Sequence, residues 1–418
     1  MRGVTHAIGS DAVSLYGEEG FVSMSQLSAA IILAAGKGTR VKADTPKMLL
    51  DMCGRTLVGH VYAAVSALQP RYTAFVVRHE REKIIQHIAQ IAPHAVIADQ
   101  DDIKGTGRAA WCAMQTLPAD LEGPVLVTAG DVPLLTADTF AALAQTLGNH
   151  AVTVLTTFVP DPHGYGRIVR EQGSAAAADT RQEAEGRQGG GAITAVAEEK
   201  DATDEQRKIH EINTSVYVFD AAFLRRSLAG LSTDNAQGEM YLTDLVALAA
   251  RTGAGVGSYT VERSIEAEGV NDLSQLAYLS AEKRRQINDV WMRSGVRMID
   301  PATAYIDVDV TLEPNAVIEP NTILRGTTHV GAYAHLGPCT TLTDVQVAAG
   351  AEVPYTMMRG GVISQHKHSQ HAHNAYNARH IRRARRKSAD NRKCASHRCS
   401  CGDAKCSRRH SSTINHEG

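Results

Sequence analysis

The sequence has no long apolar run. No stretch reaches the length of about 18 uninterrupted apolar residues that a membrane-spanning helix requires. The N-terminus also lacks a charged segment followed by a long apolar segment, which is the pattern of a secretory signal peptide. Both absences argue against a membrane or secreted protein, and we expect the chain to be cytoplasmic.

Cysteine is scarce outside the C-terminal tail. Cys53, Cys112 and Cys339 are scattered over the first 355 residues. Isolated cysteines in an intracellular protein are usually reduced and buried. We therefore expect three reduced, buried thiols in the body of the protein.

Net charge is also low, at −2, but it conceals an asymmetry. Residues 356–418 hold 14 Lys and Arg against 3 Asp and Glu, so the tail is basic and the body acidic. A chain of 418 residues, 43 % of them apolar, can supply a sizeable core. We expect two or more domains.

Apolar runs typical of buried strands alternate with helical patterns from Leu33 to about Asp244. This order predicts an α/β domain with a mainly parallel, Rossmann-like sheet covered on both faces. Ligands are then expected at the carboxyl ends of the strands. The strands are expected at 29–33, 74–77, 95–97, 124–127 and 152–155, and the helices at 58–68, 80–91, 108–117 and 136–147.

A glycine-rich segment follows the first of these strands. Leu33 is followed by A-A-G-K-G-T-R, and Lys47 lies shortly beyond it. The segment has neither the Walker spacing nor G-x-G-x-x-G. Its glycines let the backbone bring N–H groups close to a ligand, and Arg40 and Lys47 add positive charge. It suits a ligand with more than one phosphate, but an ordinary turn between strand and helix is the alternative.

Two further loops have the composition of binding sites. Q-D-D-I-K-G-T-G-R-A, from Gln100, leads into a predicted helix and could present backbone groups to a planar base. Asp131, in G-D-V-P-L, follows a predicted buried strand, where a metal-binding carboxylate would lie. Each loop could equally be an ordinary helix start or turn.

The string L-A-A-G-K-G-T-R-x(6)-K resembles the signature of sugar-nucleotide pyrophosphorylases. In that family the loop surrounds the nucleotide and its triphosphate. The resemblance implies that Leu33, Ala35, Gly36 and Lys47 bind the nucleotide. It also implies that Arg40 and Lys47 are the catalytic cations that neutralise the phosphates.

The loop from Gln100 is similar to the base-reading segment Q-x-x-Q-x-G-T-G-x-A of the uridylyltransferases in that family. Gln100, Gly105 and Thr106 match, and the resemblance implies that they read uracil. Ile103 replaces the second glutamine, which leaves a different base open. G-D-V-P-L resembles the family's metal-binding segment, so Asp131 would hold Mg²⁺.

Several further segments, in their order, resemble the bifunctional bacterial N-acetylglucosamine-1-phosphate uridyltransferase / glucosamine-1-phosphate acetyltransferase. They are G-Y-G, E-x-K-D-A, E-I-N-T, N-A-Q-G-E-x-Y-x-T-D and E-G-V-N. The resemblance covers roughly residues 25 to 355. It implies that Asn271 completes the metal site with Asp131, and that the N-acetyl sugar is held by Gly164, Glu198, Asn213, Tyr241, Thr243 and Asn271.

The implied reaction makes UDP-N-acetylglucosamine and pyrophosphate from UTP and N-acetylglucosamine-1-phosphate, for cell-wall precursor synthesis. A sugar-1-phosphate is largely ionised at pH 7, because its second pKa is about 6, so its oxygen needs no general base. The difficulty is to bring two anions together, which Mg²⁺, Arg40 and Lys47 would relieve. The alternatives are a related enzyme with another base or sugar, and a non-catalytic nucleotide-sensing subunit of the same fold.

A six-residue period appears beyond a predicted helix at 272–294. One aliphatic residue in six is the signature of a left-handed parallel β-helix. The period breaks near Pro354, so residues 308–355 would supply fewer than three coils. The family's acetyl-transfer site lies further along its β-helix, between the subunits of a trimer, so we expect that activity to be lost and a homotrimer only if the short β-helix suffices. The aliphatic residues are Leu312, Ile318, Leu324, Val330, Leu336 and Leu342.

The predicted organisation has five parts. Residues 1–24 are a disordered extension, unless translation starts at Met24; 25–271 are the nucleotidyltransferase domain, 272–298 a linker helix, 299–355 the β-helix and 356–418 the tail. Within the second part, a polar insert at 172–191 is expected to be a mobile hairpin tip between arms at 162–169 and 192–200. The tail is a disordered or frameshifted end, a nucleic-acid-binding arm, or a zinc-binding unit using Cys394, Cys399, Cys401, Cys406 or His397.

Overall fold

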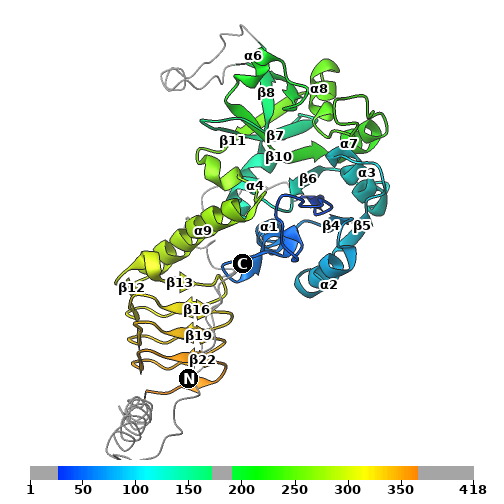
Figure 1. Cartoon of the computed structure of the whole chain (residues 1–418). Helices are drawn as coiled ribbons and strands as arrows, with labels where there is room; N and C mark the ends of the chain where they lie inside the picture. The colour runs from blue at the N-terminus through cyan, green and yellow to red at the C-terminus, as the bar shows by residue number, and fades with distance from the viewer. Residues whose placement is uncertain (1–26, 172–190, 366–418) are drawn as a thin grey trace, which may run out of the picture.

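The computed structural model describes residues 27–171 and 191–365. They form an α/β domain, a long helix and a stack of short strands (Figure 1). The predicted extension at 1–24, with the alternative start at Met24, lies outside the described residues. So do almost all of the hairpin insert and the tail from residue 366, with the alternatives given for it.

The α/β domain is built on a nine-stranded sheet. On one side of it, four strands run parallel in the order β6-β1-β4-β5. On the other side, β10 pairs antiparallel with both β6 and β7, and β11 pairs parallel with β7. The predicted mainly parallel sheet is confirmed. The strands are β1 (Ala29–Leu33), β4 (Tyr72–Val77), β5 (Val96–Asp99), β6 (Pro124–Ala129), β7 (Val152–Phe158), β8 (Gly166–Arg170), β9 (Ile193–Ala197), β10 (Glu211–Asp220) and β11 (Val256–Thr260).

Helices cover both faces of this sheet, as the sequence predicted. Strand side chains alternate, so in β1 Ala29 and Ile31 enter one core while Ala30 and Ile32 enter the other. The first core is closed by α3 (Thr106–Thr116), α7 (Ala221–Leu228) and α8 (Asp244–Arg251). The second is closed by α1 (Leu57–Ser66), α2 (Arg81–Ile91) and α4 (Ala137–Gln145). A short helix, α6 (Asp204–Arg207), lies between β9 and β10.

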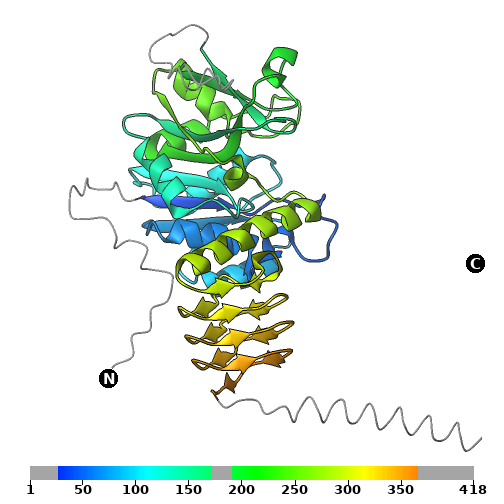
Figure 2. The ribbon, with the colours of Figure 1, turned by 90° about the vertical axis from the view of Figure 1, so that its left-hand side faces the viewer.

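A long helix, α9 (Leu273–Arg293), leads from the α/β domain to the stack of strands (Figure 2). It begins where the Asp272 carboxylate accepts a hydrogen bond from Gln275 N at 2.8 Å. It ends before Gly295, whose φ of +95° suits a helix C-terminus. Its Asn288 side chain donates to the carbonyls of Pro301 and Ala304, which fixes the helix to the first coil.

A hairpin of the α/β domain also contacts the first coil. It consists of β2 (Asp51–Met52) and β3 (Arg55–Thr56), which follow the short helix η1 (Lys47–Leu49). Val308 N donates to Cys53 O at 2.9 Å. A Cβ on Gly54 would lie 2.5 Å from Asp307 Cγ, so only glycine permits this approach.

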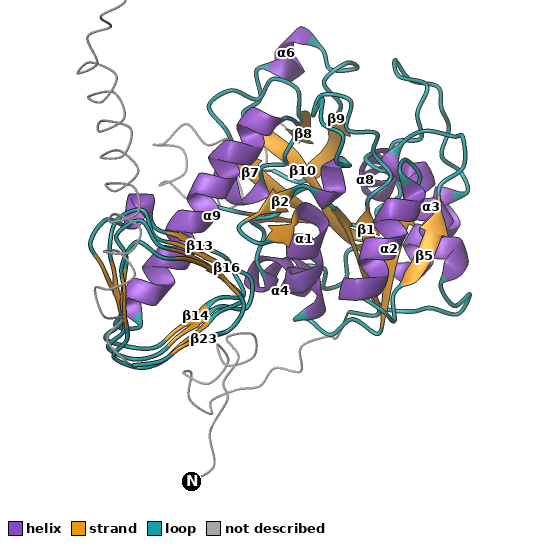
Figure 3. Cartoon of the chain, turned by 60° about the horizontal axis from the view of Figure 1, so that its bottom comes forward, coloured by secondary structure: helices purple, strands orange, loops and turns teal. Residues whose placement is uncertain are grey.

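The stack of strands is a parallel β-helix with three sheets of four strands each, which makes four coils (Figure 3). One apolar side chain from each strand fills its interior; most are buried aliphatic residues, among them Ile306, Leu324 and Leu342. The strands are β12 (Arg297–Met298), β13 (Tyr305–Ile306), β14 (Thr311–Leu312), β15 (Val317–Ile318), β16 (Ile323–Arg325), β17 (His329–Val330), β18 (His335–Leu336), β19 (Thr341–Thr343), β20 (Gln346–Val347), β21 (Glu352–Val353), β22 (Met357–Arg359) and β23 (Val362–Ile363).

The prediction of fewer than three coils is therefore wrong. The β-helix begins at Arg297, inside the predicted linker at 272–298, and continues past 355 to Ile363. The interior residues Leu342 and Val347 are five apart rather than six, and so are Val353, Met358 and Ile363. Because the turns shorten there, a strict six-residue period stops while the coils continue.

Two smaller expectations can be judged as well. The three body cysteines are free, but Cys53 and Cys112 are only half-buried and Cys339 is exposed, so full burial was wrong. Within the described parts of the chain, no helix is both long and apolar enough to cross a membrane. The cytoplasmic location stays a prediction.

Candidate functional site

The residues singled out from the sequence gather at one edge of the sheet. Leu33, Gln100 and Asp131 follow the carboxyl ends of the parallel strands β1, β5 and β6. The antiparallel strand β10 starts at this same edge, since Asn213 pairs with Thr156 near the end of β7. The sequence-distant loops therefore converge, as expected for a sheet of this class.

Lys47 packs closely against Gly38 of the glycine-rich loop. Gly38 has a φ of +61°, and a Cβ there would lie 2.8 Å from Lys47 Cβ, so glycine allows the close approach. Lys47 Nζ forms an ion pair with Asp131 Oδ2. Around Gly36 a Cβ would meet nothing within 4 Å, which leaves open space at this part of the loop.

A second polar contact lies beside the Lys47–Asp131 pair. Arg40 Nη2 donates to Asn271 Oδ1 at 2.7 Å. Val270 N donates to the backbone oxygen of Asp131 at 2.9 Å, which brings Asn271 beside Asp131. The two predicted metal ligands thus lie together, and each contacts one of the two predicted phosphate-binding cations.

An apolar cluster lies behind these polar residues. It has members next to or near each of the four in the sequence, and it extends to Leu279 on α9. A buried apolar support restricts how the polar side chains in front of it can move. The members are Val41, Leu50, Met52, Leu57, Leu134, Val270 and Leu279.

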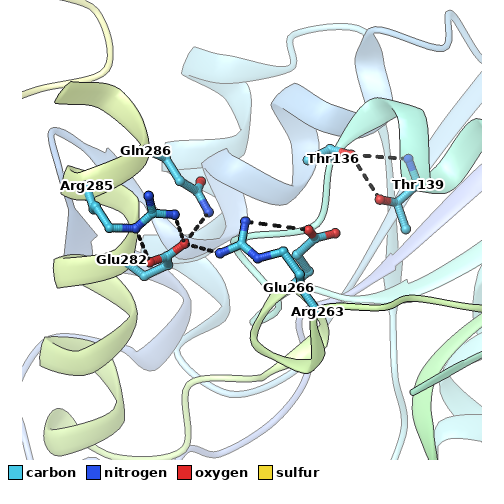
Figure 4. A network of polar contacts seen from close by, with 7 residues as sticks. All are labelled: Thr136, Thr139, Arg263, Glu266, Glu282, Arg285 and Gln286. Atoms are coloured by element: carbon cyan, nitrogen blue, oxygen red, sulfur yellow. Dashed lines mark hydrogen bonds and ion pairs between the residues drawn. The ribbon is translucent and has the colours of Figure 1, made fainter. Parts of the chain in front are cut away.

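Glu282 on α9 clamps Arg263, which lies eight residues before Asn271 in the sequence. Figure 4 shows the network of polar contacts around Glu282. Its carboxylate forms an ion pair with Arg263, which precedes the short helix η2 (Ser264–Ala267), and accepts from Arg285 Nε at 2.8 Å. Gln286 Nε2 also donates to it, at 3.1 Å. The hydrogen bonds from Arg285 and Arg263 lower the pKa of Glu282 to about 2. Nearby, Thr136 accepts from Thr139 N and so caps α4.

The loop from Gln100 is held by its own side chain. Gln100 Nε2 donates to the carbonyls of Ile103, at 3.0 Å, and Gly105, at 3.2 Å. Asp101 at the loop start is paired with Arg108 on α3. Ile103 itself is 41 % exposed. The residue that departs from the family pattern thus contributes its two backbone groups to the loop, because its N–H also donates to Asp101 Oδ1 at 3.1 Å.

This loop is joined to the segment that contains Tyr241 and Thr243. Met240 N donates to Lys104 O at 2.9 Å, and Thr106 Oγ1 accepts from Leu242 N at 3.1 Å. Gly105 has a φ of +112°, and a Cβ there would lie 2.2 Å from Met240 O. Glycine is therefore required, and Thr106 uses its hydroxyl to tie the two segments together.

Glu198, Asn213 and Thr243 form the centre of the predicted sugar site. Thr243 Oγ1 donates to Glu198 Oε1 at 2.9 Å. A Cβ on Gly166 would lie 3.5 Å from Glu198 Oε2 and 3.6 Å from Asn213 Cβ, so the three positions adjoin. Burial raises the pKa of Glu198, while its bond from Thr243 opposes that change.

Asn213 lies at a bulge of β10 and is buried. Its Nδ2 donates to the Tyr217 hydroxyl at 2.7 Å, and Ser215 N donates to its Oδ1 at 3.2 Å. Ser215 has a φ of +61°, as a bulge requires. Burial, followed by the charge of Glu198, raises the pKa of Tyr217, so its hydroxyl stays protonated.

The remaining two predicted sugar residues approach from separate loops. The Tyr241 hydroxyl accepts from Gln237 Nε2 at 2.8 Å, and burial raises the pKa of Tyr241 to about 12. Gly164 has a φ of +87°, and its N–H donates to Glu199 Oε2 at 3.1 Å. Glu199 and Arg263 were not anticipated, because a partner distant in sequence leaves no local pattern.

The donor set suits Mg²⁺. Asp131 and Asn271 supply a carboxylate and an amide oxygen, which are the hard ligands that this ion prefers. Mg²⁺ commonly takes one or two protein oxygens and completes its shell with water and substrate phosphates. Among the described residues no group of three or more His, Cys, Asp or Glu could hold a metal ion, so a site here would depend on such a shared shell.

Comparisons with known proteins identify the family. Residues 30–202 match the model of the MobA-like NTP transferase domain. The "Bifunctional protein GlmU" of Thermobifida fusca is 44 % identical over 351 residues, which are 82 % of this chain and 68 % of that relative. The chain belongs to the bifunctional GlmU family. GlmU proteins of Pseudarthrobacter chlorophenolicus and Paenarthrobacter aurescens are each 46 % identical over 340 residues, or 80 % of this chain.

The match to GlmU proteins does not extend over their whole length. This chain spans 66 % of the first of these last two relatives and 65 % of the second, just under two thirds. The family and the NTP transferase domain are thereby established. The roles of individual site residues stay predictions.

Proposed function

We propose that this chain transfers the uridyl group of UTP to N-acetylglucosamine-1-phosphate and releases pyrophosphate. The observation that carries the proposal is the convergence of Lys47, Asp131, Arg40 and Asn271 into two adjoining polar pairs. Two cations and two oxygen ligands at the carboxyl edge of the sheet match a metal-bound triphosphate. The GlmU names of the relatives support the same assignment.

The nucleotide lies against the glycine-rich loop and the loop from Gln100. With Nε2 of Gln100 bound to its own loop, its Oε1 is the atom left to accept a hydrogen bond. Uracil offers an N3–H donor there, whereas cytosine offers an acceptor at the same position. Gln100 therefore favours uracil over cytosine.

The reaction is an in-line displacement at phosphorus. A phosphate oxygen of the sugar-1-phosphate attacks the α-phosphorus of UTP, a new P–O bond forms, and the bond to the bridging oxygen of pyrophosphate breaks. The attacking oxygen is already ionised, so no proton is removed. Lys47 and Arg40 reduce repulsion between the anions and stabilise the leaving pyrophosphate.

Asp131 and Asn271 would hold Mg²⁺. When bound, this ion supplies positive charge that neutralises the phosphate oxygens and fixes their geometry. The same two side chains contact Lys47 and Arg40, so the two cations adjoin the proposed ion site.

The sugar is held by the group around Glu198. Glu198, Thr243 and Asn213 are polar side chains in a largely buried setting, which suits hydroxyl and amide groups of an N-acetyl sugar. Gly164 lies in the adjacent loop, where Glu199 accepts a hydrogen bond from its N–H. The hydrogen bond from Leu242 N to Thr106 Oγ1 links the segment proposed to bind the base to the segment proposed to bind the sugar.

The β-helix is the proposed basis for assembly. Its four coils give a larger surface than the sequence predicted, and we propose that it supports a homotrimer. Sedimentation analysis of the 418-residue chain tests this proposal separately from the activity. A monomer at micromolar concentration would contradict it.

The activity is tested by offering UTP, CTP, ATP and GTP with N-acetylglucosamine-1-phosphate, glucosamine-1-phosphate and glucose-1-phosphate, and by measuring pyrophosphate. We expect turnover with UTP and N-acetylglucosamine-1-phosphate in Mg²⁺. Preference for another pair would identify a different pyrophosphorylase. Nucleotide binding without turnover of any pair would indicate a sensing subunit.

A further inference from the structure

Arg167 connects strand β8 to the loop before it, which contains Gly164 of the predicted sugar site. This side chain comes from β8 and is almost fully buried. Its Nη1 donates to Glu199 Oε2 at 2.5 Å and to the carbonyl of Tyr165. The same Glu199 oxygen accepts from Gly164 N. Arg167 and Glu199 together therefore bind the backbone on both sides of the Gly164–Tyr165 peptide bond.

The loop that they hold adjoins the predicted sugar residues. Gly166, directly after it, pairs with Asn213 in the sheet and lies beside Glu198. The positive φ of Gly164 would be variable in a free loop, because glycine loses more conformational entropy on ordering than other residues. The two side chains therefore offset an entropy cost that sugar binding would otherwise meet.

Stability alone does not account for Arg167. Its Nε is buried and has no hydrogen-bond partner among the described residues. Burying a guanidinium is costly, and well-packed apolar residues often replace buried ion pairs without loss of stability. What an apolar residue could not do is hold Glu199 and the Tyr165 carbonyl in fixed positions.

We propose that Arg167 and Glu199 are positioning residues for the sugar phosphate. They pre-form the Gly164–Tyr165 loop, so that this loop and the neighbouring side chains are in place before the sugar arrives. This inference rests on the proposed function, because it assigns the sugar to this loop. It concerns the sugar substrate and leaves binding of the nucleotide unchanged.

The chain contains a matched control pair on the same strand. Three residues beyond Arg167, Arg170 forms hydrogen bonds with both oxygens of Glu211, at 2.8 and 2.7 Å. It also donates to Gly191 O and to Ser258, at the opposite end of β8 from the sugar loop. Arg170→Met thus removes a comparable Arg–Glu pair without touching residues 161–165.

Steady-state kinetics separates positioning from stability. We expect Glu199→Ala and Arg167→Met to raise KM for N-acetylglucosamine-1-phosphate about tenfold, while KM for UTP changes less than about twofold. Glu199→Gln should recover part of the loss, because its amide oxygen can still accept from Gly164 N. Glu199 is 25 % exposed, so its variants are expected to fold even if Arg167→Met does not. Arg170→Met should lower the melting temperature without raising KM for the sugar phosphate more than KM for UTP.

Hydrogen exchange provides a readout that needs no substrate. In Glu199→Ala the amides of residues 163–165 should exchange at least about tenfold faster than in wild type, and in Arg170→Met they should not. Unchanged exchange, or an equal rise in both KM values, would overturn the positioning role. Wild-type enzyme without uridyl transfer would instead refute the proposed function, and the exchange measurement would still decide whether the pair fixes the loop.

Discussion

Lys47 forms an ion pair with Asp131, although 84 residues separate them in the sequence. Both side chains are largely buried, with exposed fractions of 11 % and 17 %. The predicted phosphate-binding cation and the predicted metal-binding anion therefore neutralise each other's charge. Without this pair, either charge would carry a substantial desolvation penalty.

Asp131→Ala tests the metal role. We expect the variant to lose on the order of 10²-fold or more in turnover, which is about 3 kcal/mol of transition-state stabilisation. Circular dichroism should show an intact fold. Near-normal Mg²⁺-dependent turnover would remove Asp131 from the site, whatever its effect on stability.

Arg40→Ala and Lys47→Ala test the phosphate contacts. Each should lower kcat/KM for UTP, because each removes a charge-assisted contact to the developing pyrophosphate. KM for the sugar phosphate should change less. If only KM for the sugar phosphate changed, these side chains would bind the sugar phosphate rather than UTP.

Glu282→Gln tests the clamp on the Asn271 segment. It should weaken the hold on Arg263, raise the Mg²⁺ concentration needed for half-maximal activity and speed hydrogen exchange at residues 264–271. The matched control is Arg285→Gln, which alters a contact within α9 and leaves the Arg263–Glu282 pair intact. Equal effects of the two variants would contradict a clamp.

The same carboxylate predicts a pH dependence. Its pKa lies at about 2 in the folded protein, below its ordinary value of 4.5, so its contribution is full above pH 4.5 and is lost as the pH falls toward 2. The difference in unfolding free energy between wild type and Glu282→Gln should shrink over that interval. A difference that grows on acidification would reverse the assigned sign.

Gly54→Ala tests the contact between hairpin and β-helix. A Cβ there meets Asp307 at 2.5 Å and the residue has a φ of +84°, so we expect a loss of about 1–3 kcal/mol in stability. Gly253→Ala is the control, since its φ is +68° but nothing lies within 4 Å. Equal losses of melting temperature in both variants would show that the contact adds nothing beyond backbone strain.

Acetyl transfer is the last expectation to test. Glucosamine-1-phosphate and acetyl-CoA, supplied to the 418-residue chain, should release no free thiol. That expectation was made from fewer than three predicted coils, with the family's acetyl-transfer site lying further along the β-helix. Because the described residues form four coils, the β-helix extends further than that expectation assumed, and the assay decides the point. Clear thiol release would refute the expected loss.

Local patterns predicted much of the fold. Strand β1 was expected at 29–33 and lies there, because a short apolar run followed by glycine and other small residues is typical of a buried strand that ends in a turn. The helix expected at 272–294 is α9, and Asp272 and Gly295 mark its ends. The last coil was missed because its interior residues are spaced by five, which a search for sixes cannot detect.

Partners distant in the sequence were harder to predict. The sequence identified Lys47 and Asp131 separately, each by its own segment, but not their mutual contact. Glu199 and Glu282 carry no family pattern and differ from other surface glutamates only through the arginines that the fold brings to them. Side chains that act on other side chains are visible only once the chain has folded.

The close approach of Gly54 to Asp307 has a consequence for how the molecule moves in solution. This approach joins the α/β domain to the first coil, while Asn288 joins α9 to the same coil, so rotation about a single hinge would break one of the two contacts. Helix α9, with 21 residues, is about 30 Å long and acts as a strut beside these contacts. We therefore expect the β-helix and the α/β domain to share one rotational correlation time in solution.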